Sequence, residues 1–155
     1  CQVAKNFGGV PHRAELVRVL DGVSYYNDSI GTSPTRTANG TLQLYDRKII
    51  LIAGGYDKQI PYDTLGPIIM DKVKTLILMG ATADKIEAAV KAAPNYCEQE
   101  IVILHANSME KAVALAKEQA QKGDIVSLSP ASASFDLYPN FEARGNHFKN
   151  IVNAL

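Results

Sequence analysis

Residues 73–105, VKTLILMGATADKIEAAVKAAPNYCEQEIVILH, hold the pattern that decides the fold. The runs 73–79 and 100–105 have the length and near-continuous hydrophobicity of strands that are buried on both faces. Between them, Thr82 can cap a helix whose apolar residues recur at helical spacing, and Pro94 ends that helix. Strand, helix and strand in this order predict a parallel sheet covered by helices.

The same alternation continues on both sides of this stretch. Three further segments have the composition of strands: 23–27, 48–53 and 124–129. Asn107 and Glu110 form a capping box that predicts a helix ending at Lys122 and Gly123. An opening helix is predicted to end at Asp21 and Gly22, and a closing helix to run to the end. The apolar residues behind these last two predictions are Leu16, Val17 and Leu20, and Phe148, Ile151, Val152 and Leu155.

No linker, repeat or low-complexity segment divides the 155 residues. We therefore expect one α/β domain over residues 1–155, an open, mostly parallel Rossmann-like sheet with helices on both faces. Sixteen Lys and Arg balance sixteen Asp and Glu, which disfavours a nucleic-acid partner. No apolar run approaches the roughly 20 residues of a membrane span, and Cys1 and Cys97 are too few for a disulfide framework. These features predict a cytoplasmic protein, and the first residue, Cys rather than Met, predicts a piece of a longer chain.

Three polar loops each follow a predicted strand, where open α/β sheets bind ligands. In the first, 28–34, Thr32 and Ser33 precede Pro34 and can form an anion site at a helix start; the alternative is a capped helix without a ligand. In the second, Gly54 and Gly55 allow a sharp turn before Lys58, which can hold a carboxylate or be a surface charge. Neither a phosphate-binding loop of the Walker type nor a dinucleotide fingerprint is present.

The third loop reads SPASASFD over 129–136 and exposes small hydroxyl side chains to a bound anion. A nucleophilic Ser134 is disfavoured, because no G-x-S-x-G elbow is present and His12, His105 and His147 have no matching spacing. His105 is predicted to be a structural histidine at the end of a buried strand. We expect no metal ligands, since no His, Cys or carboxylate cluster has ligand spacing.

Five motifs stand together in one order along the chain. They are His12-Arg13, Asn27-Asp28-Ser29 with Thr32, Gly54-Gly55 with Lys58, Ser129 to Asp136, and Asn140-Phe141-Glu142 with Arg144-Gly145. In this order the sequence resembles the C-terminal domain of the Mur ligases, most closely the members that add D-glutamate. The resemblance implies an amide-forming ligase that uses ATP and Mg²⁺, bound mainly by a central domain. That domain and an N-terminal UDP-binding domain are both absent from this chain.

The implied reaction converts the carboxylate of UDP-N-acetylmuramoyl-L-alanine to an acyl phosphate, which the amine of D-glutamate attacks. By the resemblance, Lys58, Thr32 and Ser134 bind D-glutamate, and the backbone at Phe135 and Phe141 completes the pocket. Asp28 would lie near the ribose of the nucleotide and Arg13 near the adenine or phosphates. No catalytic residue and no metal ligand is assigned to this domain alone, so we expect it to be inactive in isolation.

The sequence departs from the family pattern at Ile30, where many relatives carry a lysine, and at Tyr56 and Asp57. One cation near the nucleotide is therefore missing, while the spacing to Lys58 is kept. Alternatives are another Mur ligase or a folylpolyglutamate synthase, or a non-catalytic module that binds a nucleotide or an amino acid. An αβα domain of unrelated role also remains an alternative.

Overall fold

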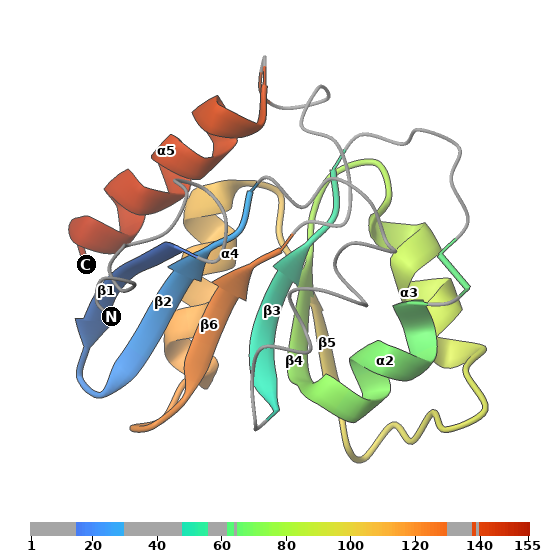
Figure 1. The fold of residues 1–155 in the computed structure, drawn as a ribbon. Coiled ribbons are helices and arrows are strands. Elements are labelled where there is room, and N and C mark those ends of the chain that lie inside the picture. The colour runs from blue at the N-terminus through green and yellow to red at the C-terminus, as the bar shows by residue number, and fades with distance from the viewer. Residues whose placement is uncertain (1–14, 30–47, 56–61, 64, 130–137, 139) are drawn as a thin grey trace, which may run out of the picture.

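A computed structural model describes residues 15–29, 48–55, 62–63, 65–129, 138 and 140–155 (Figure 1). Six strands form one sheet in the order β1-β2-β6-β3-β4-β5. Their bounds are Glu15–Leu20 (β1), Val23–Asn27 (β2), Ile49–Ala53 (β3), Val73–Leu78 (β4), Val102–His105 (β5) and Ile125–Leu128 (β6). Only β1 is antiparallel to its neighbour, and the other pairs are parallel. The predicted mostly parallel α/β sheet is confirmed.

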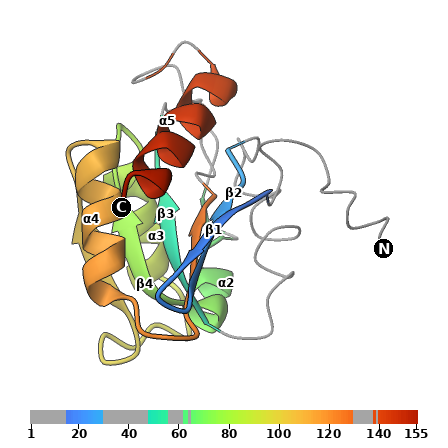
Figure 2. The same cartoon turned by 90° about the vertical axis from the view of Figure 1, so that its left-hand side faces the viewer.

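Helices cover both faces of this sheet (Figures 1 and 2). They are α2 (Leu65–Lys72), α3 (Ala83–Lys91), α4 (Met109–Gln119) and α5 (Phe141–Asn153). Strand β3 alternates between two cores, because Ile49 and Leu51 pack with α2 and α3, while Ile50 and Ile52 pack with α4 and α5. All five residues of β3 are completely buried. A near-continuous apolar strand is therefore explained by burial on both faces.

The predicted opening helix is wrong, since Leu16, Val17 and Leu20 belong to strand β1. Asp21 and Gly22 both have positive φ, 54° and 80°, as a two-residue hairpin between β1 and β2 requires. A register shift between Leu16 and Arg18 interrupts the alternation of the strand. That irregularity produced an apparent helical spacing, and the Asp-Gly pair was a hairpin turn rather than a helix end.

Helix α4 differs in extent from the prediction, and helix α2 was not predicted. Helix α4 starts after Ser108, whose hydroxyl accepts from the Lys111 N–H at 3.1 Å, so the cap is one residue beyond Asn107. It ends at Gln119, before the predicted Lys122 and Gly123. The closing helix is confirmed as α5 and begins at Phe141.

Helix α2 has only eight residues and runs directly into β4, so the sequence showed no separate helical period. In the described part of the chain, no helix is long and apolar enough to cross a membrane.

Candidate functional site

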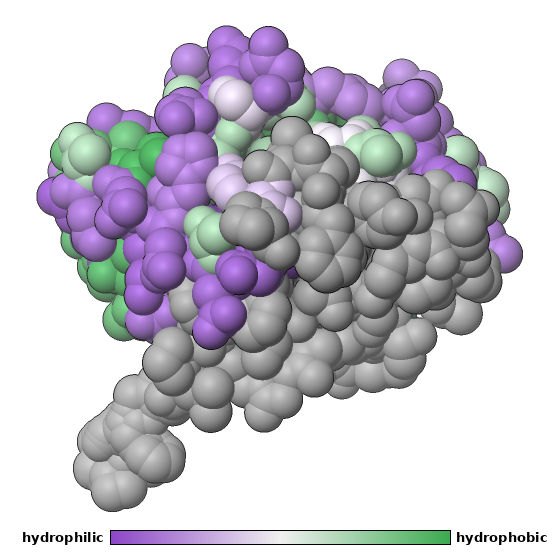
Figure 3. Space-filling view, turned by 90° about the horizontal axis from the view of Figure 1, so that it is seen from above, coloured by the Kyte–Doolittle hydropathy of each residue, from purple (hydrophilic) through white to green (hydrophobic). Residues whose placement is uncertain are grey.

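The buried polar side chains gather at one end of the sheet, where the parallel strands finish. Among the described residues, the buried polar or charged ones at this end are Asn27, Asp28, Ser29, Thr82, Ser127, Ser129 and Arg144. Figure 3 views the molecule from this end, and its described surface is mainly hydrophilic. Open α/β sheets bind ligands at this edge. The structure thus places a polar, largely buried cluster where the sequence predicted the site.

The turn after β2 holds the predicted nucleotide residue Asp28. Its N–H donates to the Leu128 carbonyl at 2.8 Å, which extends the β2–β6 pairing by one residue. The next N–H, of Ser29, donates to Asn27 Oδ1 at 3.0 Å. Asp28 is only 2% exposed. The backbone on both sides of this carboxylate is therefore fixed by hydrogen bonds.

Arg144 reaches this turn from α5 and is 3% exposed. Its Nε donates to Ser29 Oγ at 3.0 Å and its Nη2 donates to the Ser29 carbonyl at 2.8 Å. A planar guanidinium can make two such bonds at once, and a buried cation is costly unless it makes them. Sequence reasoning placed Arg144 in the fifth motif of the resemblance but gave it no role in the site. The available signal was its place on the buried face of α5, four and eight residues before Phe148 and Val152.

The loops after β3 and β4 are joined by two hydrogen bonds. Gly55 N–H donates to Thr82 Oγ1 at 2.9 Å, and Thr82 N–H donates to the Gly55 carbonyl at 3.0 Å. Thr82 precedes α3 as predicted, but its side chain makes no capping bond to the helix. Gly54 has φ of 108°, and a Cβ there would lie 1.9 Å from the Met79 carbonyl oxygen. These contacts fix the point where the segment carrying Lys58 leaves the sheet.

The hydroxyl-rich loop starts from a fixed base at the end of β6. The Ser127 and Ser129 hydroxyls are buried and hydrogen bonded to each other at 2.7 Å. Ser129 N–H donates to the Ile52 carbonyl at 3.1 Å. At the far end of the loop, Asn140 caps α5 by accepting from the Ala143 N–H at 2.7 Å. The start of α5, with its unpaired N–H groups, is therefore held at this same end of the sheet.

A chain of hydrogen bonds anchors Tyr138 beside this loop. Its hydroxyl lies 2.5 Å from His147 Nδ1, and His147 Nε2 lies 3.0 Å from Glu110 Oε2. A neutral imidazole can donate to Glu110 and accept from Tyr138 at the same time. Burial, with a contribution from the Glu110 carboxylate, raises the pKa of Tyr138 to about 12. Tyr138 thus ties the segment before α5 to both α4 and α5.

The predicted site residues divide into two groups. Asp28 lies in the polar cluster, and Phe141 is the first residue of α5. Five others fall outside the described residues: Arg13, Thr32, Lys58, Ser134 and Phe135. Ser33, Pro34, Ile30, Tyr56 and Asp57 also fall outside them. Their roles stay predictions, and the described turns mark where each loop leaves the sheet.

A second polar group lies at the edge strand β5. We expected no metal-ligand cluster, but Asp84, Glu87 and His105 bring three ligand atoms within 4.8 Å of one another. His105 was also expected on a buried strand, and its side chain is 46% exposed because β5 is an edge strand. Lys91 Nζ lies 2.9 Å from Glu87 Oε2, and His105 Nε2 lies 2.8 Å from Oε1. These hydrogen bonds, from Lys91 first and then His105, lower the pKa of Glu87. Glu87 is thus already paired with the Lys91 ammonium and hydrogen bonded to His105.

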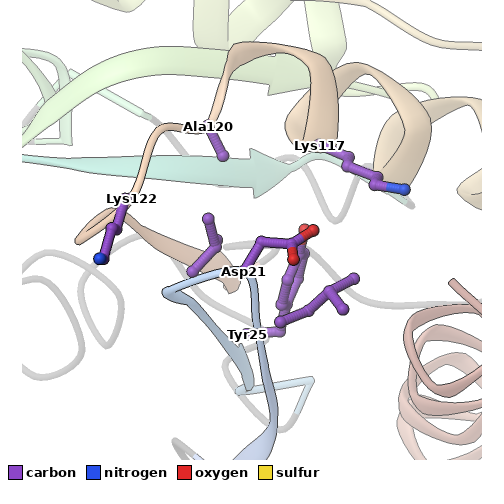
Figure 4. Close-up of a pocket in the computed structure, with 7 residues that line it drawn as sticks. Asp21, Tyr25, Lys117, Ala120 and Lys122 are labelled. Carbon is purple, nitrogen blue, oxygen red and sulfur yellow. The ribbon is translucent and has the colours of Figure 1, made fainter.

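A cavity of about 220 Å³ lies at the opposite end of the sheet, beside the β1–β2 hairpin (Figure 4). It is lined by Leu20, Asp21, Val23, Tyr25, Lys117, Ala120 and Lys122. Burial raises the pKa of Tyr25, and the nearby Asp21 adds to this. The cavity lies away from the C-terminal ends of the parallel strands, so we do not assign the candidate site to it.

Comparison with known proteins identifies the family of this chain. A family model described as "Mur ligase, glutamate ligase domain" matches residues 12–132. The chain belongs to the Mur ligase family. The resemblance predicted from five motifs is therefore confirmed, and the polar cluster above is the strand-end cluster of a Mur ligase domain.

Sequence relatives of this Mur ligase domain are close. It is 58% identical over 155 residues to a UDP-N-acetylmuramoylalanine–D-glutamate ligase of Clostridium botulinum (strain Okra / Type B1). It is 57% identical over 156 residues to the ligase of the same name from Clostridium acetobutylicum. Each match covers 99% of this chain and 33% of the relative. The chain thus spans about a third of the length of the curated relatives that it matches.

Solved structures support the fold of the Mur ligase domain. A murein peptide ligase from Psychrobacter arcticus covers the whole chain with a TM-score of 0.59 and 17% identity. A Mycobacterium tuberculosis folylpolyglutamate synthase complexed with ADP covers 92% with a TM-score of 0.57 and 12% identity. The chain covers 32% of each of these structures. At such identities the likeness concerns architecture alone.

Proposed function

We propose that this chain is the C-terminal, amino-acid-binding domain of an ATP-dependent ligase in peptidoglycan precursor synthesis. The ligase would join D-glutamate to UDP-N-acetylmuramoyl-L-alanine through an acyl phosphate. The observation that carries the proposal is 57–58% identity, over the whole chain, to ligases named for D-glutamate. The folylpolyglutamate synthase alternative has structures of 12% and 13% identity in its favour, and at that level the likeness concerns architecture alone. The proposal includes a cytoplasmic enzyme with further UDP-binding and central ATPase domains, and the greater length of the relatives leaves room for such domains.

The chemistry of the chain suits a dicarboxylate substrate. D-glutamate needs partners for two carboxylates and a free amine that can attack the acyl phosphate. In the proposal, the Lys58 ammonium pairs with one carboxylate, and the Thr32 and Ser134 hydroxyls donate to D-glutamate. The backbone at Phe135 and at Phe141, the first residue of α5, completes the pocket. These residues would bind and orient the amino acid, and the bond-forming groups would come from the substrates.

The nucleotide side of the proposal rests on Asp28 and Arg13. A carboxylate at Asp28 can accept hydrogen bonds from ribose hydroxyls, and the fixed turn around it supports that role. Because Asp28 is nearly buried, a ribose can reach it only if covering residues move. Arg13 would lie near the adenine or the phosphates. ATP would be held mainly by the central domain, which this chain does not include.

The described residues do not fit a Mg²⁺ site. Mg²⁺ requires oxygen ligands, and the cluster of three ligand atoms found in the described part of the chain includes an imidazole. Asp28 is the only carboxylate in the described polar cluster. The proposal therefore places Mg²⁺ on residues outside this domain and derives no step through it here.

Lys58 provides the sharpest test of the proposal. In the intact enzyme, Lys58→Ala removes a charge-assisted contact, with a loss of about 2–5 kcal/mol if the contact is desolvated. The KM for D-glutamate should then rise up to a few orders of magnitude, and the KM for ATP should change much less. Lys58→Arg should not restore binding, because the guanidinium differs in shape and hydration. Lys117→Ala is the matched control, since Lys117 is exposed on α4 beside the cavity at the other end of the sheet.

Two outcomes would contradict the proposal. A normal KM for D-glutamate in both Lys58 variants would make Lys58 an ordinary surface charge. An intact protein that binds nucleotide but forms no amide from any amino acid would favour the non-catalytic module. The isolated chain should show no ligase or ATPase turnover, because positioning of the phosphates and metal would depend on the other domains.

A further inference from the structure

Hydrogen bonds and an ion pair form a closed ring from α5 to the turn after β2 and back. Arg144 donates twice to Ser29, at 3.0 and 2.8 Å. Ser29 donates through its N–H to Asn27 Oδ1 at 3.0 Å, and Asn27 Nδ2 donates to Glu15 Oε1 at 3.4 Å. Glu15 is paired with Lys149 at 3.3 Å, and Lys149 is again on α5. Arg144 and Lys149, the two residues of the ring that lie on α5, are thus five positions apart on this helix.

Ser29 takes part in three hydrogen bonds of this ring. Its N–H is bonded to Asn27, and its hydroxyl and carbonyl are both bonded to Arg144. Asp28 lies between Asn27 and Ser29, and its own N–H is bonded to Leu128. The backbone is therefore fixed before and after Asp28, which sets the direction in which its side chain leaves the backbone. On the α5 side, the two bonds from Arg144 hold Ser29.

Helix α5 does not depend on Arg144 to stay in place. Phe148 and Val152 are completely buried in the core shared with α4, and Asn140 caps the start of the helix. Removal of the guanidinium fork should therefore loosen the turn more than it displaces the helix. A change at Arg144 should therefore affect the turn that carries Asp28 and leave the start of α5 in place.

We infer that Arg144 is a positioning residue for nucleotide binding, which acts through Ser29 to hold Asp28 in the orientation that the ribose requires. The inference rests on the proposed function for the role of Asp28. The fork is essential to it, because a lysine has a single nitrogen that cannot reproduce two parallel N–H bonds to a hydroxyl and a carbonyl. Arg144 itself touches neither substrate nor reacting atoms in this account.

The test compares Arg144→Lys with Arg18→Lys in the intact enzyme. Arg18 also binds α5, through bonds from Nη1 to the carbonyls of Val152 at 3.0 Å and Asn153 at 3.3 Å. Among the described residues, its side-chain hydrogen bonds go to α5 and not to the turn after β2. Arg18→Lys therefore measures the effect of losing an arginine that holds the same helix. We expect Arg144→Lys to raise the KM for ATP and the Kd for ADP by about 10-fold, the effect of one lost charge-assisted bond. The KM for D-glutamate should change less than about threefold, and Arg18→Lys should change neither value.

Ser29→Ala extends the test and guards against a misfolded arginine variant. It removes the hydroxyl that Arg144 Nε binds, and Ala is compatible with the turn backbone. If Arg144 acts through Ser29, the Kd for ADP of the double variant should rise less than the product of the two single effects. Fully multiplicative effects would overturn the inference. So would an unchanged Kd for ADP in Arg144→Lys with a lowered melting temperature, which would make Arg144 purely structural.

The two proposals fail in different ways. The Kd for ADP is measured without the ligase reaction, so it tests the role of Arg144 even if D-glutamate is not the substrate. An enzyme that lacks amide formation, yet shows the expected ADP effects, would contradict the proposed ligase while supporting Arg144. Normal ligase activity with unchanged ADP binding in both Arg144→Lys and Ser29→Ala would support the proposed ligase and contradict the role of Arg144.

Discussion

Thr82 and Gly55 are joined by hydrogen bonds that run in opposite directions, at 2.9 Å into the Thr82 hydroxyl and at 3.0 Å from the Thr82 N–H. Both residues are buried. The loops after β3 and β4 therefore behave as one unit, and the threonine that could have capped α3 holds a neighbouring loop. The segment with Lys58 starts directly from this pair.

Thr82→Val should destabilise the fold by about 1–3 kcal/mol, because the buried Gly55 N–H loses its acceptor. Thr82→Ser keeps the hydroxyl and should cost clearly less. Free energies of unfolding from urea titration measure both. Ser108→Ala, which removes the side-chain cap of α4, is a reference for loss of a single exposed cap, at about 1 kcal/mol. A Thr82→Val variant as stable as wild type would show that Gly55 does not need this acceptor.

Gly54→Ala and Gly123→Ala separate steric clash from backbone strain. Both glycines have positive φ, 108° and 95°, so each alanine is strained by about 1–2 kcal/mol. Only at Gly54 would the new Cβ also meet a backbone carbonyl, at 1.9 Å, while at Gly123 nothing lies within 4 Å. We expect Gly54→Ala to lower the unfolding free energy by at least about 2 kcal/mol more than Gly123→Ala. Equal losses in the two variants would argue against the close approach at Met79.

Tyr138 should make stability fall at high pH. Its pKa in the folded state is raised to about 12, whereas an unfolded tyrosine has a pKa of about 10. The stabilisation is thus fully present below about pH 10 and is lost as the pH rises toward 12. In Tyr138→Phe this loss should disappear, together with one late step in the tyrosinate absorbance titration. Tyr96→Phe should keep that step, and a Tyr138→Phe titration identical to wild type would contradict the assignment.

Glu87 should make the stability of the fold decrease at low pH. Its folded pKa is lowered by hydrogen bonds from Lys91 and His105, so its stabilisation is present above the unfolded pKa of about 4.3. That stabilisation is lost as the pH falls through the folded pKa. Glu87→Gln should therefore be less stable than wild type at neutral pH, by about 0.2–1 kcal/mol, and converge with it in acid. The comparison uses melting temperatures over pH, with Glu118→Gln as an exposed control.

The parallel part of the sheet could be predicted because strands that are buried on both faces have nearly continuous apolar sequences. Strands β3, β4 and β6 are such runs. The first strand could not be found this way, since its edge position exposes Leu16 and Val19 and its bulge breaks the alternation. Helix α2 was missed because a short helix that enters a strand without a break has no boundary signal.

The polar end of the sheet, where the candidate site lies, could be predicted from the loops, but the contacts within it could not. Strand ends located the turn with Asp28, and the order of motifs located the family. The partnership of Arg144 with Ser29 joins residues 115 positions apart, and no local pattern encodes such a pair. His105 and Glu87 likewise meet only because β5 lies at the sheet edge beside α3.

The ring through Arg144 and Lys149 also has a consequence for the order of folding. Strands β1 and β2 are the first described elements to leave the ribosome, and α5 is the last. The turn at Asp28 therefore lacks its hydrogen bonds from Arg144 until α5 has been synthesised. The conformation of this turn would thus be completed only when α5 is in place.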